Sequence, residues 1–132
     1  MPVNIYGFLA IGAGAACGAW LRWWLAALCN PVFPTLPLGT LAANLLGGYL
    51  IGVMIEILGQ YAVLAPEVRL AIITGFLGGL TTFSTFSAET FTLLSREQYL
   101  WTVVIVTAHV VGSVTLTALG VLTAKWLIAQ GV

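Results

Sequence analysis

The sequence predicts an all-α integral membrane protein with four transmembrane helices, because charged residues are scarce and widely separated. Of the 132 residues, 61% are hydrophobic and 6% are Asp, Glu, Lys or Arg, and the mean hydropathy is +1.09. A soluble domain usually carries about 25% of these charged residues. The uncharged stretches 1–21, 23–55, 70–88 and 98–124 can each hold a spanning helix of roughly 20 residues. A transmembrane barrel would instead show alternating segments of about 10 residues, and no such alternation is present.

The first helix is expected from about residue 5 to residue 28, because Asn30-Pro31 acts as a helix stop. Cys17 and Cys29 both belong to this stretch and would lie roughly 18 Å apart at about 1.5 Å per residue. That separation excludes a disulfide between them, so we expect both cysteines to be buried packing residues.

Proline and charge bound the other three helices. The proline-rich loop 31–37 cannot remain helical, so the second helix is expected over about 38–58. The third is expected after Pro66-Glu67, because proline and a carboxylate are both favoured at helix starts, and it continues to about residue 94. After a short polar turn, the fourth helix is expected over about 99–128.

The four basic residues give no preferred orientation in the membrane. Four spans place both termini on one side, together with Arg69 and Lys125, and leave Arg22 and Arg96 on the other. This balance removes the Lys/Arg bias that normally sets topology. We therefore predict dual topology, with an antiparallel homodimer of two oppositely oriented copies in the lipid bilayer. The alternative is that the exact position of one span breaks the tie.

Small residues recur at a spacing of four on the first two helices. Such faces let helix backbones approach closely in lipid, where no hydrophobic force drives helices together. We expect these faces to be packing surfaces. They comprise Gly14 and Gly18, with Arg22 at the same spacing, on the first helix, and Gly39, Ala43 and Gly47 together with Asn44, Gly48 and Gly52 on the second.

The third span contains a segment that favours unwinding near its middle. Gly75, Gly78 and Gly79 precede a cluster of hydroxyl residues, and each glycine weakens a helix by up to about 1 kcal/mol relative to alanine. Freed carbonyls are tolerated at this depth where they are buried in protein, line a cavity or coordinate a cation. We expect a break in mid-membrane; the alternative is an unbroken helix whose hydroxyls bond to the preceding turn. The hydroxyl residues are Thr81, Thr82, Ser84, Thr85 and Ser87.

Two phenylalanines accompany these hydroxyls. Phe83 and Phe86 lie three residues apart, hence on one helix face, with Ser84 and Ser87 beside them. A phenyl ring is negative on its face and positive at its edge. Rings presented edge-on can therefore stabilise a small anion without a full positive charge. The alternative is that both rings face lipid or the core.

The segment 75–86, GFLGGLTTFSTF, resembles the signature of the Fluc/CrcB family of fluoride channels. Two further segments match in order, GAWLR at 18–22 and GTLAANLLG at 39–47, and the resemblance extends over nearly the whole chain. It implies a passive fluoride-selective channel that exports F⁻ across the bacterial cytoplasmic (inner) membrane and relieves fluoride toxicity. It also implies an antiparallel dual-topology homodimer with two pores, each lined by both subunits.

The resemblance also implies roles for individual residues by position. Phe83 and Phe86 correspond to paired phenylalanines whose ring edges contact fluoride. Asn44 corresponds to a pore-lining asparagine, and Arg22 to a basic residue near the vestibule. The polar stretch associated with the ion path comprises Ser84, Thr85 and Ser87, and Glu89 matches an acid of the family.

A structural sodium ion is implied at the centre of the dimer interface. Its ligands would be backbone carbonyls at positions that correspond to Gly78 and Thr81, contributed by both subunits. This agrees with the expected break, because a buried cation needs carbonyls released from helix bonding.

The fourth helix carries a second polar face. His109, Ser113 and Thr117 recur at a spacing of four, and we include Ser113 in the ion pathway. A lone histidine without a nearby Cys, Asp or second His is not expected to bind a metal. We expect His109 to be a polar residue with satisfied hydrogen bonds. The alternative is that it lines a vestibule, because an ionisable group inside a membrane is a functional candidate by default.

Other functions agree less well with the sequence. A small dual-topology proton-coupled exporter of cationic drugs is the main alternative, but it needs a membrane-embedded carboxylate, and the first helix has no Asp or Glu. A non-transporting assembly subunit explains the glycine faces but not the hydroxyl cluster. An enzyme is not expected, since there is no Asp, one His, and no Ser-His or Cys-His pairing with an acid. Zero net charge likewise argues against a nucleic-acid partner.

Overall fold

The computed structural model describes residues 3–60 and 64–131 of the chain. Within them, four helical segments are long and apolar enough to cross a membrane: Ile5–Val32, Leu38–Gln60, Pro66–Ser95 and Tyr99–Ala129. These are the four spans that the charge pattern predicted. The expectation of an all-helical, multi-pass membrane protein is thus confirmed.

The first span ends where the sequence predicted a stop. Helix α1 (Ile5–Cys29) is followed by one turn of 3-10 helix, η1 (Asn30–Val32). Asn4 caps the start of α1, because its side-chain oxygen accepts a backbone hydrogen bond at 2.7 Å. Cys17 and Cys29 are free thiols, as expected, but neither is buried on this chain: Cys17 is exposed and Cys29 is half-buried.

The remaining spans differ in regularity. The second span is one helix, α2 (Leu38–Gln60), and the fourth is one helix, α6 (Tyr99–Ala129). The third span consists of four elements: α3 (Pro66–Arg69), the π-helix η2 (Leu70–Leu77), α4 (Gly78–Leu80) and α5 (Phe83–Ser95).

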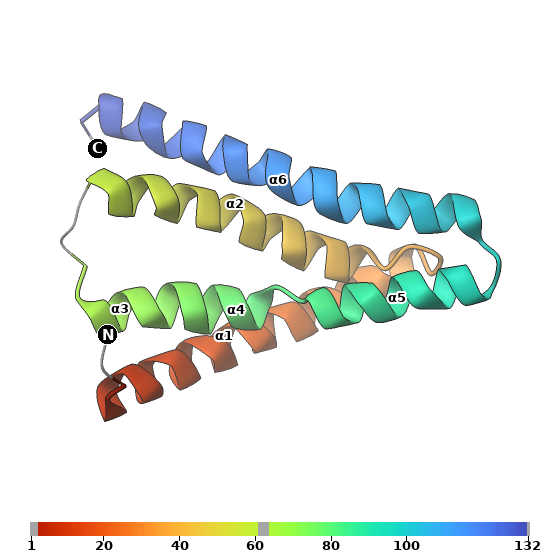
Figure 1. The fold of residues 1–132 in the computed structure, drawn as a ribbon, viewed down its shortest axis with the longest axis horizontal. Coiled ribbons are helices and arrows are strands. Elements are labelled where there is room, and N and C mark those ends of the chain that lie inside the picture. The colour runs from red at the N-terminus through yellow and green to blue at the C-terminus, as the bar shows by residue number, and fades with distance from the viewer. Residues whose placement is uncertain (1–2, 61–63, 132) are drawn as a thin grey trace.

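The spans pack as two pairs that meet at one end of the molecule. Helix α6 packs along α2, while α1 packs against η2 and α4 (Figure 1). The pairs come together near η1, where Gly39 of α2 lies against the backbone of Ala26 in α1. Both termini lie at the opposite end (Figure 1), as an even number of spans requires.

Glycines make these pairings close. A side chain at Gly18 would collide with the carbonyl oxygen of Phe76, and one at Gly52 would collide with that of Thr117. The first contact joins α1 to the third span, and the second joins α2 to α6. The small-residue faces predicted from the sequence are therefore packing surfaces, which is the role such faces have in lipid.

The π-helix at Leu70–Leu77 is a feature that the sequence did not predict. Its residues are almost all apolar, so the hydrophobic pattern contains no signal that separates this helix type from an ordinary α-helix. Gly75 within it lies against the carbonyl oxygen of Ile11 in α1. Segments of π-helix occur frequently at functional sites, and only the short helix α4 separates this one from the break in the third span.

Candidate functional site

The third span is broken near its middle, at Thr81 and Thr82. Their backbones are extended, with φ/ψ of −84°/153° and −147°/117°, between α4 and α5. The predicted break is confirmed, although Gly78 and Gly79 themselves remain helical. Thr82 leaves the helix because a side chain from another helix satisfies both of its main-chain groups, whereas the Thr81 amide still donates to the Leu77 carbonyl oxygen at 3.0 Å.

Asn44 of α2 holds the broken backbone. Its Oδ1 accepts a hydrogen bond from the Thr82 amide at 2.7 Å, and its Nδ2 donates to the Thr82 carbonyl oxygen at 3.0 Å. Nδ2 also lies 3.0 Å from Nδ1 of His109. An unpaired main-chain group in hydrocarbon costs several kcal/mol, so this one side chain removes two such costs.

Two further side chains complete the break. The Thr82 hydroxyl accepts a hydrogen bond from the Thr85 amide at 3.1 Å, which caps α5, and donates to Thr85 Oγ1 at 3.0 Å. On the other side, Nε of Arg22 donates to the Gly79 carbonyl oxygen at 2.9 Å. This places a cation at the carbonyl end of a helical segment, where the helix dipole favours positive charge.

An aromatic cluster lies immediately after the break. The rings of Phe83 and Phe86 are in edge-to-face contact, with centroids 5.5 Å apart and an interplanar angle of 63°. The Phe86 ring is also 4.6 Å from the imidazole of His109, tilted by 32°. Phe86 is 8% exposed whereas Phe83 is 78% exposed. One ring therefore faces the interior of the chain and the other faces outward.

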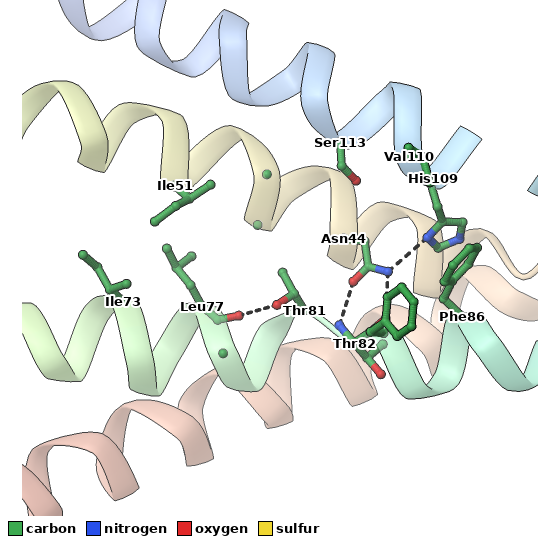
Figure 2. A pocket seen from close by; sticks show the side chains of 14 residues that line it. Asn44, Ile51, Ile73, Leu77, Thr81, Thr82, Phe86, His109, Val110 and Ser113 are labelled. Atoms are coloured by element: carbon green, nitrogen blue, oxygen red, sulfur yellow. Dashed lines mark hydrogen bonds between the residues drawn. The ribbon is translucent and has the colours of Figure 1, made fainter. Parts of the chain in front are cut away.

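These groups surround a pocket of about 450 Å³ (Figure 2). Its wall is formed by α2, η2, α4, α5 and α6 together with the break. Most of the wall is aliphatic, aromatic or glycine, and no Asp, Glu, Lys or Arg among the described residues lines it. The polar groups of the wall are Asn44, Thr81, Thr82, His109 and Ser113.

A second pocket, of about 380 Å³, lies along α5. Thr85, Glu89, Thr92 and Arg96 line it and recur every three or four residues, so they form one polar stripe that begins at the break. Oε1 of Glu89 accepts a hydrogen bond from the Thr40 hydroxyl at 2.6 Å. Its Oε2 is buried and has no partner among the described residues.

The residues predicted for the ion path do not all lie in these pockets. Ser87 lines neither: it is exposed, and its hydroxyl donates to the Phe83 carbonyl oxygen at 2.8 Å. Ser84 is also exposed, 3.3 Å from the Thr82 hydroxyl. Thr85 lines the second pocket. The first pocket is lined by Asn44, Gly78, Thr81, Phe83, Phe86 and Ser113.

Two residues are more prominent in the structure than the sequence suggested. Thr82 was one hydroxyl among five, yet it provides the extended backbone and the cap of α5. His109 was expected to have satisfied hydrogen bonds, but only its Nδ1 has a partner, and its buried Nε2 has none among the described residues. The sequence signal for His109 was an isolated imidazole within an apolar span.

Fold and site together define a four-span membrane protein with an uncharged polar pocket at a broken helix. Residues 9–121 match the family described as CrcB-like protein, Camphor Resistance (CrcB). The chain belongs to this family, in agreement with the resemblance of its third span.

Curated relatives are similar over almost their whole length. A protein of Nitrosospira multiformis named Fluoride-specific ion channel FluC is 65% identical, covering 95% of this chain and 98% of the relative. Proteins of the same name from Cupriavidus taiwanensis and Thiobacillus denitrificans are 54% and 53% identical. They cover 92% and 91% of this chain and 96% and 97% of the relatives.

Proposed function

We propose that this chain is a fluoride-selective passive channel of the bacterial cytoplasmic membrane, which exports F⁻ and so relieves fluoride toxicity. The observation that carries the proposal is the pocket at the break, where neutral polar groups and two phenyl rings meet without a charged side chain in the wall. The identity of the ion, fluoride, is taken from the names of the relatives. Those names are of an ion channel and not of an enzyme, as the sequence led us to expect.

The chemistry of the pocket suits a small anion that has lost its water. The Thr81 and Thr82 hydroxyls already donate to the Leu77 carbonyl oxygen and to Thr85 Oγ1. The Ser113 hydroxyl can donate a hydrogen bond to an ion in the pocket, and the edges of Phe83 and Phe86 present positive partial charge. Conduction requires that an ion bind strongly enough to enter and weakly enough to leave. Several weak neutral contacts meet that requirement better than one buried arginine, and Arg22 is directed at the Gly79 carbonyl.

The polar stripe on α5 supports a path between the two pockets. The hydroxyls of Thr82 and Thr85 are in contact, and the first lines one pocket while the second lines the other. An ion that leaves the aromatic cluster would next meet the Thr85 hydroxyl. Ser113 on α6 and Ser84 on α5 extend the series of hydroxyls beside the break.

An antiparallel homodimer would complete each pore. Phe83 is 78% exposed although it lines the pocket, so on this chain alone one side of the aromatic cluster is uncovered. A second copy supplies the missing wall, and two copies give two pores. Arg22 lies at the break, so it does not count toward the charge at either end of the spans. The basic residues near the ends are then Arg69 and Lys125 on one side of the membrane and Arg96 on the other. A bias of one positive charge is small enough to permit both orientations.

The break also provides carbonyl groups suited to a structural Na⁺. The usual helix donor to the Gly78 carbonyl is the Thr82 amide, which is bound to Asn44 instead. The usual donor to the Thr81 carbonyl is the Thr85 amide, which is bound to the Thr82 hydroxyl. Carbonyls released in this way can coordinate Na⁺. Gly78 is exposed on this chain, so both subunits could contribute.

Fluoride efflux from liposomes that contain the purified protein tests the proposal. We expect rapid fluoride efflux and no chloride efflux from the unmodified protein, and loss of fluoride efflux in Phe83→Ile and Phe86→Ile. Phe91→Ile is a matched control, since Phe91 is an exposed ring of the same helix that lines neither pocket. Undiminished fluoride efflux in the first two variants would refute the role of the rings.

A further inference from the structure

His109 is the only histidine of the chain, and it lies in the wall of the pocket at the break. It is 5% exposed, and its ring packs against that of Phe86. Figure 2 shows the imidazole between Phe86 and Asn44, with Nδ1 toward the asparagine. Both ring nitrogens are thus buried, and their hydrogen-bonding states follow from their neighbours.

The backbone of Thr82 determines which nitrogen of His109 carries the proton. A main-chain N–H can only donate, so the Asn44 atom that the Thr82 amide contacts is the oxygen, Oδ1. The atom of Asn44 that faces His109 is therefore Nδ2, which can only donate. Nδ1 must accept this hydrogen bond, and the proton of the neutral imidazole is on Nε2.

The Nε2–H group is consequently a buried donor with no acceptor among the described residues. Leaving such a group unpaired costs about 1–3 kcal/mol. The two N–H bonds of Asn44 are already occupied by Thr82 and His109. Among the side chains that meet at the aromatic cluster, His109 therefore has an N–H available for a bound ion and Asn44 has none.

We infer that His109 donates a hydrogen bond from Nε2–H to fluoride as the ion passes Phe86. The inference rests on the proposed function and adds an ion-binding residue on α6 to those on the third span. Fluoride is a small acceptor and suits an N–H that lies beside an apolar ring. Because the donor is neutral, it can replace a lost water without holding the anion as a full charge would.

Asn44 and Thr82 then act at a distance from the ion. Asn44 is a positioning residue for His109, since its Nδ2 fixes the protonated nitrogen and the orientation of the ring. Thr82 in turn fixes the orientation of Asn44. The break in the third span therefore sets the state of a donor on the fourth span.

Nitrogen NMR of the unmodified protein tests the inference directly. With ¹⁵N-histidine labelling, the single histidine gives one imidazole, so its signals need no assignment. We expect a protonated Nε2 and an unprotonated Nδ1, and we expect fluoride but not an equal concentration of chloride to shift the Nε2–H resonance. Any of three results would overturn the inference. They are a proton on Nδ1, an equal shift of the Nε2–H resonance with chloride, and an Nε2–H resonance that fluoride does not shift in a protein that conducts fluoride. The last result would leave the proposed function intact.

A variant provides the second readout. His109→Phe keeps an aromatic ring against Phe86 but removes the N–H, and we expect fluoride efflux to fall at least about tenfold, as loss of a hydrogen bond to a charged group implies. Thr123→Val is the matched control, because it also removes one side-chain donor from α6 but lies outside both pockets. Equal efflux in His109→Phe and the unmodified protein would also overturn the inference.

Discussion

Asn44 binds both the amide nitrogen and the carbonyl oxygen of Thr82, a residue 38 positions later in the chain. The break in the third span is therefore held by tertiary hydrogen bonds and is not a frayed helix end. Two residues of extended backbone would be costly inside a membrane if their main-chain groups were unpaired. Because Asn44 of α2 supplies the partner for both main-chain groups of Thr82, the break is part of the packed fold.

Replacing Asn44 with alanine should destabilise the protein and remove fluoride conduction. The Thr82 amide and carbonyl would each lose a partner, at about 1–3 kcal/mol per group. The thermal unfolding midpoint in detergent and fluoride efflux from liposomes measure the two effects. Asn4→Ala is the control: it removes one cap at the far end of α1, costs about 1 kcal/mol and should leave efflux unchanged. An Asn44→Ala protein as stable as the control would contradict this account of the break.

Arg22→Gln should lower stability through the Gly79 carbonyl. The charged hydrogen bond at 2.9 Å is worth about 1.5–3 kcal/mol, and the helix end would lose its compensating charge. Arg69→Gln removes one positive charge at the start of the third span, away from the break, and serves as the control. If both variants unfold at the same temperature, the contact between Arg22 and the break is energetically unimportant.

Gly18→Ala should prevent close packing of α1 on the third span. The added methyl group would lie 2.1 Å from the Phe76 carbonyl oxygen, so the two backbones must separate. We expect little folded protein in a size-exclusion profile after purification. Gly12→Ala, on the same helix, has open space at the corresponding point and should behave like the unmodified protein. A normal yield of folded Gly18→Ala protein would show that close backbone contact between α1 and the third span is not required for folding.

Sodium should stabilise the assembled protein if released carbonyls bind it. A ligand present at about 100 times its dissociation constant adds roughly 2.7 kcal/mol to the folded state. We expect a higher thermal midpoint in sodium chloride than in N-methylglucamine chloride of equal ionic strength, with potassium giving a smaller increase. Identical midpoints in all three salts would argue against the cation site at Gly78 and Thr81.

Dual topology can be measured by cysteine labelling in cells. Glu67 and Glu97 lie at opposite ends of the third span, and each can be replaced by cysteine after Cys17→Ser and Cys29→Ser remove the native thiols. Because a bias of one basic residue is too small to select one orientation, we expect an impermeant maleimide to label about half of each variant from outside. Complete labelling of one position and none of the other would establish a single orientation.

The sequence was sufficient for the course of the helices but not for their internal detail. Charge scarcity located four spans, and proline at 31 and 66 located two of the boundaries. The glycines and threonines correctly indicated a break in the third span. The π-helix at Leu70–Leu77 was not predicted, because a nearly uniform apolar run has no period that distinguishes it.

The site was predictable where it depends on local sequence and unpredictable where it depends on partners. Phe83 and Phe86 share a face because they are three residues apart. Nothing in the sequence showed that Phe86 would be buried and Phe83 exposed. Those outcomes depend on which helix packs on which face of α5. The hydroxyl of Ser87 bonds back to the preceding turn, as the alternative for the hydroxyl cluster expected, although the span is broken.

Composition and spacing by themselves determined a four-span membrane protein with a weakened third helix, since both follow from transfer of residues into hydrocarbon and from local backbone preference. Only the tertiary structure decided how the weakness is used. Asn44, Thr82 and His109 are on three different spans, and their hydrogen bonds form only when α2 and α6 pack beside the break. Hydrogen bonds between residues distant in the chain produce no periodic pattern in the sequence. For that reason, which nitrogen of His109 carries the proton could be inferred only from the tertiary structure.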